Sequence, residues 1–313
     1  MSEGLSPENE LSEAIPPSSF IERWAIGILF LALFLISFSP FFTRLSEVGP
    51  ISTGAGRAAL SLPLMFAMFW RDKKDRAYLV TPAARKDVLL LILAGVIFAG
   101  NLVFWNLSVM MTSVANSVVI SNMAPVFVAL VSWLFFKERF TRTFLGSLAL
   151  AIFGVMLMMS DSFQASPQAL AGDALALVNA CFFAGYFITV ARVRQRVSAA
   201  SVMFVGGLAS SLITVTIAYI FEPQVWPHTA RGWAVMAGMV LVVHVGGQTL
   251  LAMSLRYVSA SLSSMMMLLQ PILPALMAWI AFGEKLVWQQ IAGTALTFVG
   301  IAIAQRSQAT KSS

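Results

Sequence analysis

The chain has 313 residues, of which 58% are apolar and only 11% are charged, whereas soluble globular domains average about 25% charged residues. This composition excludes a water-soluble fold, because too few polar side chains exist to cover the surface of the folded chain. The net charge of +6 does not indicate nucleic acid as a partner. The basic residues are spread over short loops, where anionic headgroups of the lipid bilayer are the expected partner.

The first 23 residues contain five glutamates and one arginine, and they lack the basic start and the cleavage site of a secretory signal. We expect residues 1–23 to form a disordered cytoplasmic tail. Ten apolar runs follow, each close to the roughly 20 residues that span a bilayer as a helix. We expect transmembrane helices at residues 24–42, 50–70, 88–108, 112–136, 143–160, 172–191, 200–221, 231–253, 258–283 and 287–305. The predicted fold class is therefore all-α, an integral membrane protein with ten transmembrane helices.

The distribution of positive charge over the loops predicts the orientation in the membrane. With a cytoplasmic amino terminus, sixteen basic residues fall on the inner side, three fall on the outer side, and Arg57 remains inside a span. The positive-inside rule therefore favours this orientation. Because the number of helices is even, both termini are expected to be cytoplasmic, with residues 306–313 as a second tail. In a bacterium the expected location is the cytoplasmic (inner) membrane.

An internal repeat relates the two halves of the chain. The shared residues lie 146 positions apart and include Pro125 and Pro271, Trp133 and Trp279, and Glu138 and Glu284. We expect a first repeat at residues 24–160, a linker at 161–171 and a second repeat at 172–305. Because each unit has five spans, an odd number, the second unit enters the membrane with opposite polarity. Such inverted repeats are typical of secondary transporters that alternately open a midplane site.

The repeated pattern is similar to that of a known family. It runs from Asn101 through Pro125 and Glu138 to Gly154, and again from Gly247 to Gly300. This pattern resembles the EamA-like branch of the drug/metabolite transporter (DMT) superfamily. The resemblance implies ten helices, cytoplasmic termini, a central cavity between the halves, and mostly export of metabolites, amino acids or drug-like compounds. It says nothing about which compound is carried.

Arg57 is a charged residue within an apolar span. It lies about eight residues into the second span, about 10 Å below the outer boundary at the helical rise of about 1.5 Å per residue. A charge at such depth costs about 2.5 to 3.5 kcal/mol, so the side chain is expected to face the bundle interior or to snorkel outward. One interpretation is a substrate-binding anchor for an anion or a carboxylate near the outer gate. The other is a structural clamp on carbonyl groups or on an acidic partner such as Glu47.

His244 is the second deep ionisable residue, near the middle of the eighth span, and Gln248 lies one turn further on the same face. This pair is able to donate and accept hydrogen bonds to a polar substrate, and His244 is also able to carry a proton. The competing interpretation is a buried histidine that bonds to a neighbouring helix. Both interpretations remain open from the sequence.

Further candidate substrate-binding residues lie on the third and sixth spans. Asn101 and Trp105 share one face of the third span, and Asn179 and Tyr186 share one face of the sixth. Aromatic rings with a few amides are typical of a small-molecule cavity. However, polar residues also join membrane helices by hydrogen bonds worth about 0.6 kcal/mol each. Each of these residues is therefore either a substrate contact or a helix-helix contact.

Three prolines are candidate hinges, because a proline within a helix removes a backbone donor and frees the carbonyl four residues earlier. Pro125 would free the carbonyl of Ser121, and Pro271 and Pro274 would do the same in the ninth span. The alternative is a fixed kink satisfied by neighbouring hydroxyl groups. Gly293 and Gly300 lie on one face of the last helix, where they allow close helix packing or a contact in a homodimer.

The function predicted from these features is secondary transport. We expect an exporter or exchanger of small organic metabolites, such as amino acids, related amphipathic metabolites or drug-like compounds, that works by alternating access. The alternative is a membrane-embedded transferase or another non-transport membrane protein; an enzyme would need converging acid, base or metal-ligand groups. Two histidines and one cysteine do not easily supply them. We therefore expect no catalytic residue, no metal and no cofactor.

Overall fold

The computed structural model describes residues 19–75, 85–112, 117, 120–158, 167–270 and 288–309. All regular secondary structure within these ranges is helical, which confirms the all-α class. Within these ranges, five helical segments are long and apolar enough to cross a membrane: Ala25–Thr43, Arg85–Ser108, Ala169–Val193, Ala199–Phe221 and Ala230–Ser254. Many large apolar side chains on their outer faces are exposed, as expected for a surface in contact with lipid. The count of ten spans stays a prediction.

The amino-terminal half follows the predicted order of spans. Its helices are α2 (Ser19–Arg23), α3 (Ala25–Ile36), α4 (Ser39–Leu45), α5 (Pro50–Asp75), α6 (Arg85–Met111), α8 (Ala124–Phe136) and α9 (Arg142–Met158). The last five residues of the expected tail form α2, and the first expected span is divided between α3 and α4. The division lies just before Pro40, which occupies the first turn of α4, where a missing backbone N–H has no cost.

The carboxyl-terminal half contains two long helices that are partly wound as wider π-helix. Its elements are α10 (Pro167–Val193), α11 (Ala199–Ser201), η2 (Val202–Gly206), α12 (Gly207–Phe221), α13 (Ala230–Gly238), η3 (Met239–Gln248), α14 (Thr249–Ser254), α15 (Ala260–Met266), η4 (Met267–Leu269) and α17 (Trp288–Ala309). The π-helical stretches η2 and η3 interrupt the seventh and eighth predicted spans. Helix α10 begins at Pro167, so residues 167–171, expected in the linker, form its first turns.

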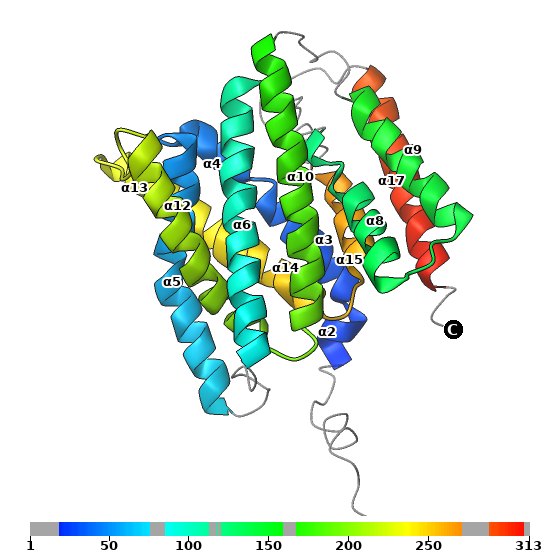
Figure 1. Ribbon diagram of the computed structural model, residues 1–313, viewed down its shortest axis with the longest axis horizontal. Helices are drawn as coiled ribbons and strands as arrows, with labels where there is room; N and C mark the ends of the chain where they lie inside the picture. Colours follow the sequence, from blue (N-terminus) through cyan, green and yellow to red (C-terminus); the bar gives the residue numbers. More distant parts are fainter. Residues whose placement is uncertain are drawn as a thin grey trace, which may run out of the picture.

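Helices of the two halves pack against each other in pairs. Helix α9 packs along α17, α6 along α10, α5 along α12, and α3 against η3 and α14. Figure 1 shows α9 and α17 side by side at one edge, and α6 beside α10. Glycines permit the closest approaches: a Cβ atom added to Gly300 would lie 2.7 Å from the carbonyl oxygen of Ser147 on α9. This packing brings the middle of the helices from both halves around one interior site.

Candidate functional site

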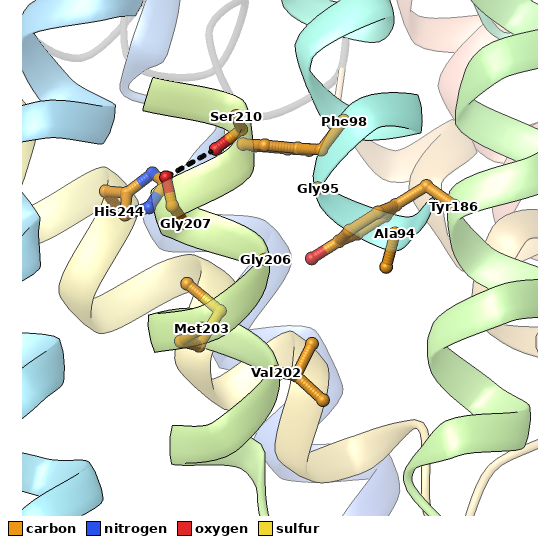
Figure 2. Close-up of a pocket in the computed structure, with 10 residues that line it drawn as sticks. All are labelled: Ala94, Gly95, Phe98, Tyr186, Val202, Met203, Gly206, Gly207, Ser210 and His244. Atoms are coloured by element: carbon orange, nitrogen blue, oxygen red, sulfur yellow. Dashed lines mark hydrogen bonds between the residues drawn. The ribbon is translucent and has the colours of Figure 1, made fainter. Parts of the chain in front are cut away.

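A narrow cavity lies where α6, α10, α12, η2 and η3 meet. Its lining residues are Ala94, Gly95, Phe98, Tyr186, Val202, Met203, Gly206, Gly207, Ser210 and His244. About 270 Å³ of space, part of it open to the outside of the molecule, lies among these residues, and little of it is wide enough for a water molecule. Figure 2 shows side chains from several helices around it, with the hydroxyl group of Tyr186 directed into the cavity. Helices of both halves therefore share one interior site near the middle of the bundle.

Phe98 is the centre of a cluster that contains three of the predicted substrate-binding residues. Its ring centroid lies 5.0 Å from that of Tyr186 and 5.9 Å from that of His244. On another side, the guanidinium carbon of Arg57 lies 5.8 Å from the Phe98 centroid. The structure thus brings Arg57 on α5, Tyr186 on α10 and His244 on η3 around one aromatic ring of α6. Arg57 itself does not line the cavity in its present form.

Arg57 is a buried cation, with 6% of its surface exposed. Its Nη1 donates a hydrogen bond to Oγ of Ser39 at 3.2 Å, and its Nε has no hydrogen-bond partner in the described part of the chain. The carboxylate of Glu47, the expected acidic partner, instead accepts hydrogen bonds from the backbone N–H groups of His228 and Thr229 at 3.1 and 3.2 Å. Among the described residues Arg57 forms no ion pair with Glu47, and this carboxylate instead holds the start of α13.

His244 and Gln248 are also buried polar residues, with 1% and 2% of their surfaces exposed. Three of their side-chain atoms have no hydrogen-bond partner among the described residues: both ring nitrogens of His244 and the side-chain oxygen of Gln248. Buried polar groups are nearly always hydrogen-bonded in native structures, and an exception calls for an explanation such as a bound ligand or water. Both residues belong to η3, and π-helical turns inside helices frequently mark functional sites.

The other predicted substrate-binding residues lie outside the cavity lining. Asn101 donates a hydrogen bond from Nδ2 to Oδ1 of Asn179 at 2.6 Å, and Nδ2 of Asn179 donates to Oγ of Ser121 at 2.9 Å. This chain of bonds joins α6, α10 and the segment before α8, in agreement with the interpretation as helix-helix contacts. Trp105 is half-buried on α6 and does not line the cavity. Substrate contact by these three residues stays a prediction.

Of the three predicted hinge prolines, only Pro125 is among the described residues. It lies in the first turn of α8, after a turn at Asn122 and Met123 that interrupts the expected fourth span. A proline in a first turn removes no helical hydrogen bond, so any hinge in this region would be the turn itself. Pro271 and Pro274 lie outside the described residues, and the hinge role stays a prediction for all three.

Several lining residues were not anticipated from the sequence, although the internal repeat contains a signal for some of them. Phe98 and His244 are separated by 146 residues, and so are Arg57 and Met203. This is the offset of the predicted repeat, which predicts that these pairs occupy equivalent positions in the two halves. Gly95 and Gly206 mark the crossing of α6 and η2, because a Cβ atom on Gly95 would overlap the carbonyl oxygen of Gly206.

Comparison with known proteins agrees with this architecture. The chain is 24% identical over 225 residues to the pseudopaline exporter CntI of Pseudomonas aeruginosa strain UCBPP-PA14, and equally to CntI of strain PAO1, covering 72% of this chain and 78% of each exporter. A solved structure described only as a crystal structure of a protein superposes with a TM-score of 0.77, over 91% of this chain and 98% of that one. Its sequence identity of 16% supports a shared fold only.

The characteristic sequence of the EamA-like transporter family matches the chain twice, once in each half. The matches span residues 23–160 and 170–305. Together with the apolar helices, they establish a multi-pass membrane protein. The chain belongs to the EamA-like transporter family, within the drug/metabolite transporter superfamily.

Proposed function

We propose that the protein is a secondary transporter that exports or exchanges small organic metabolites by alternating access, with the cavity beside Phe98 as its central site. The observation that carries this proposal is a set of buried polar atoms near that cavity, Nε of Arg57 and both ring nitrogens of His244, which have no hydrogen-bond partner among the described residues. A fold does not retain such groups for stability, since each unsatisfied buried group costs about 1 to 3 kcal/mol. A polar solute that visits the cavity supplies the missing partners.

The helix pairing supports two inverted five-helix repeats. In the repeat, α3 corresponds to α10, and α6 corresponds to the helix that contains η3. The packing of α3 on η3 is therefore equivalent to the packing of α10 on α6, while α5–α12 and α9–α17 each join a helix to its own equivalent. A twofold relation between the halves produces this set of pairs. The ring contact between Phe98 and His244 places two equivalent residues together at the centre.

The narrowness of the cavity supports movement as part of the mechanism. Because little of the space is wide enough even for a water molecule, entry of a metabolite requires a rearrangement of the surrounding helices. Two similar halves that exchange conformations open such a site first to one side and then to the other. The charge distribution of the loops supports cytoplasmic termini and, in a bacterium, a location in the inner membrane. The named activity of the similar CntI proteins supports outward transport.

A counterflow assay tests the transport proposal. Purified protein is reconstituted into liposomes that contain one unlabelled solute, and uptake of the same labelled solute is followed for amino acids, organic acids, nucleosides and cationic drugs in turn. We expect at least one solute to accumulate above the level in protein-free liposomes. Met203→Trp, which fills the cavity, is expected to abolish this uptake. Met156→Trp, on an exposed position of α9, is the matched control and is expected to retain it.

Two results would overturn the proposal. If no solute of the panel enters faster than into protein-free liposomes, the transport function fails. If Met203→Trp folds, as judged by an unchanged elution volume and unfolding temperature, and still exchanges solute at the wild-type rate, this cavity is not the transport site.

A further inference from the structure

The substrate class follows from the charge around Phe98, provided that the transport function proposed above is correct. Arg57 places one positive charge against the Phe98 ring, and within the described ranges its one hydrogen bond goes to the neutral Ser39. A guanidinium group carries five N–H donors and stays charged at any physiological pH. Among the described residues no carboxylate pairs with it, and the residues that line the cavity include no Asp or Glu. The site is therefore electropositive.

His244 adds hydrogen-bonding capacity to the site. Its ring is buried and lies against the same phenylalanine as Arg57. A neutral imidazole has one N–H donor and one acceptor nitrogen, and both are without partners in the described part of the protein. Because Gln248 offers a further unused oxygen on the same segment, this side of the site suits a hydroxyl group.

The walls of the cavity suit an apolar or aromatic body. The rings of Phe98 and Tyr186 are tilted against each other at 5.0 Å, and Met203 lines the same space. Offset aromatic contacts are worth about 0.5 to 1.5 kcal/mol beyond the area that they bury. An anion with an apolar side would thus meet the guanidinium at one end and the aromatic wall along its length.

We propose that the transported solute is a net-negative organic acid whose carboxylate pairs with Arg57, whose neighbouring hydroxyl group bonds to His244, and whose apolar part lies against Phe98 and Tyr186. The Phe98 ring lies against Arg57 and also lines the cavity, so we expect the carboxylate to reach the guanidinium after this side chain rotates. Arg57, which has no carboxylate partner among the described residues, selects against cations, because a cationic solute would be repelled and would find no carboxylate on the lining.

A charge series of one molecular shape tests this inference by binding. The probes are phenyllactate, its neutral amide phenyllactamide, and the corresponding primary amine, each added to the full chain in lipid nanodiscs while the unfolding temperature is measured. We expect phenyllactate to raise the unfolding temperature in a saturable manner, because a ligand stabilises the state that it binds. The amide and the amine are expected to require concentrations about 10- to 100-fold higher, because they lose a charge-assisted hydrogen bond.

Variants of Arg57 separate a binding role from a structural one. In Arg57→Gln the response to phenyllactate is expected to fall about 10- to 100-fold, while Arg57→Lys keeps part of it. Arg231→Gln removes the same charge from an exposed position at the start of α13 and is the control expected to bind normally. Without ligand, Arg57→Gln is expected to unfold at the wild-type temperature or higher, because an unpaired buried charge has been removed.

Three outcomes of the binding and unfolding measurements overturn the inference. One is an equal or stronger response to the amine than to phenyllactate. Another is an unchanged phenyllactate response in Arg57→Gln that is folded. The third is a large drop in the unfolding temperature of ligand-free Arg57→Gln with no effect of Arg57→Lys, which assigns Arg57 to the fold. If counterflow finds a transported neutral or cationic solute, this inference fails while the transport function stands. If no solute exchanges, transport fails although anion binding is still measurable.

Discussion

Glu222 provides a quantitative test of how the two halves are joined at one end of the bundle. The residue follows α12, and its two carboxylate oxygens accept hydrogen bonds from the backbone N–H groups of Ile51 and Ser52, both at 2.9 Å. These N–H groups belong to the first turn of α5 and have no partner within that helix. In addition, the carboxylate neutralises the positive end of the α5 dipole.

Substitution Glu222→Gln removes the charge and one of the two acceptors. A hydrogen bond to a charged group contributes about 1.5 to 3 kcal/mol, and a charge at a helix terminus contributes about 0.3 to 1 kcal/mol. We therefore expect the free energy of unfolding to fall by about 2 to 3 kcal/mol. Gly49→Ala is expected to act in the same direction, because the new Cβ atom would overlap the Glu222 carboxylate.

The assay is equilibrium unfolding in mixed micelles, followed by the fluorescence of the eight tryptophans. Glu138→Gln is the matched control, since Glu138 is exposed and this substitution is expected to change the free energy by less than about 0.5 kcal/mol. If Glu222→Gln and Glu138→Gln have the same small effect, the carboxylate does not hold the start of α5, and the argument from hydrogen-bond geometry is refuted.

Three further predictions concern stability in the same assay. The pKa of Glu47 is lowered from its ordinary value of 4.5, mainly by the hydrogen bond from the Thr229 hydroxyl group. The ionised Glu47 therefore stabilises the fold above pH 4.5, and this stabilisation is lost as the pH falls through the lower pKa of the folded state. The loss of stability on acidification should be smaller in Glu47→Gln, and parallel pH profiles of the two proteins would contradict this. Asn179→Ala removes hydrogen bonds of 2.6 and 2.9 Å and is expected to cost about 1 to 2 kcal/mol; no change in the unfolding midpoint would argue against a role as a helix-helix contact. Gly300→Ala is expected to destabilise the α9–α17 pair by about 1 to 3 kcal/mol, whereas Gly146→Ala, where a Cβ atom meets nothing within 4 Å, should be neutral; equal effects would show that this crossing is not tightly packed.

Much of the helical order was predictable because apolar run length determines where a membrane helix forms. The third span was expected at residues 88–108 and is Arg85–Met111, and the eighth was expected at 231–253 and covers Ala230–Ser254. The division of the first span at Ser37 and the π-helical winding of η3 were not predictable. The hydrophobicity of a segment indicates that it lies in lipid. It does not indicate where the backbone hydrogen bonds shift by one residue from the α-helical to the π-helical pattern.

The candidate site was partly predictable for a different reason. A charge or an imidazole in an apolar span must face the interior, so Arg57 and His244 were found from the sequence. The surroundings of Arg57 were not found from the sequence. Proximity along the chain favoured Glu47 as its partner, whereas the fold brings Thr229 to the Glu47 carboxylate. Phe98 was overlooked because one phenylalanine among 24 has no signal of its own. Its equivalence to His244 in the repeat is the feature that distinguishes it.

The proposed mechanism requires that the cavity become accessible from both sides of the membrane in turn. Cysteine at position 210, which lines the cavity, is introduced by Ser210→Cys in a Cys181→Ser background, and a membrane-impermeant thiol reagent is added to right-side-out or inside-out vesicles. We predict modification from each side, and loss of counterflow after modification. Thr297→Cys, buried between α9 and α17, is the control that should stay unmodified. Reaction of the Ser210→Cys variant from only one side, or from neither, would contradict alternating access at this site.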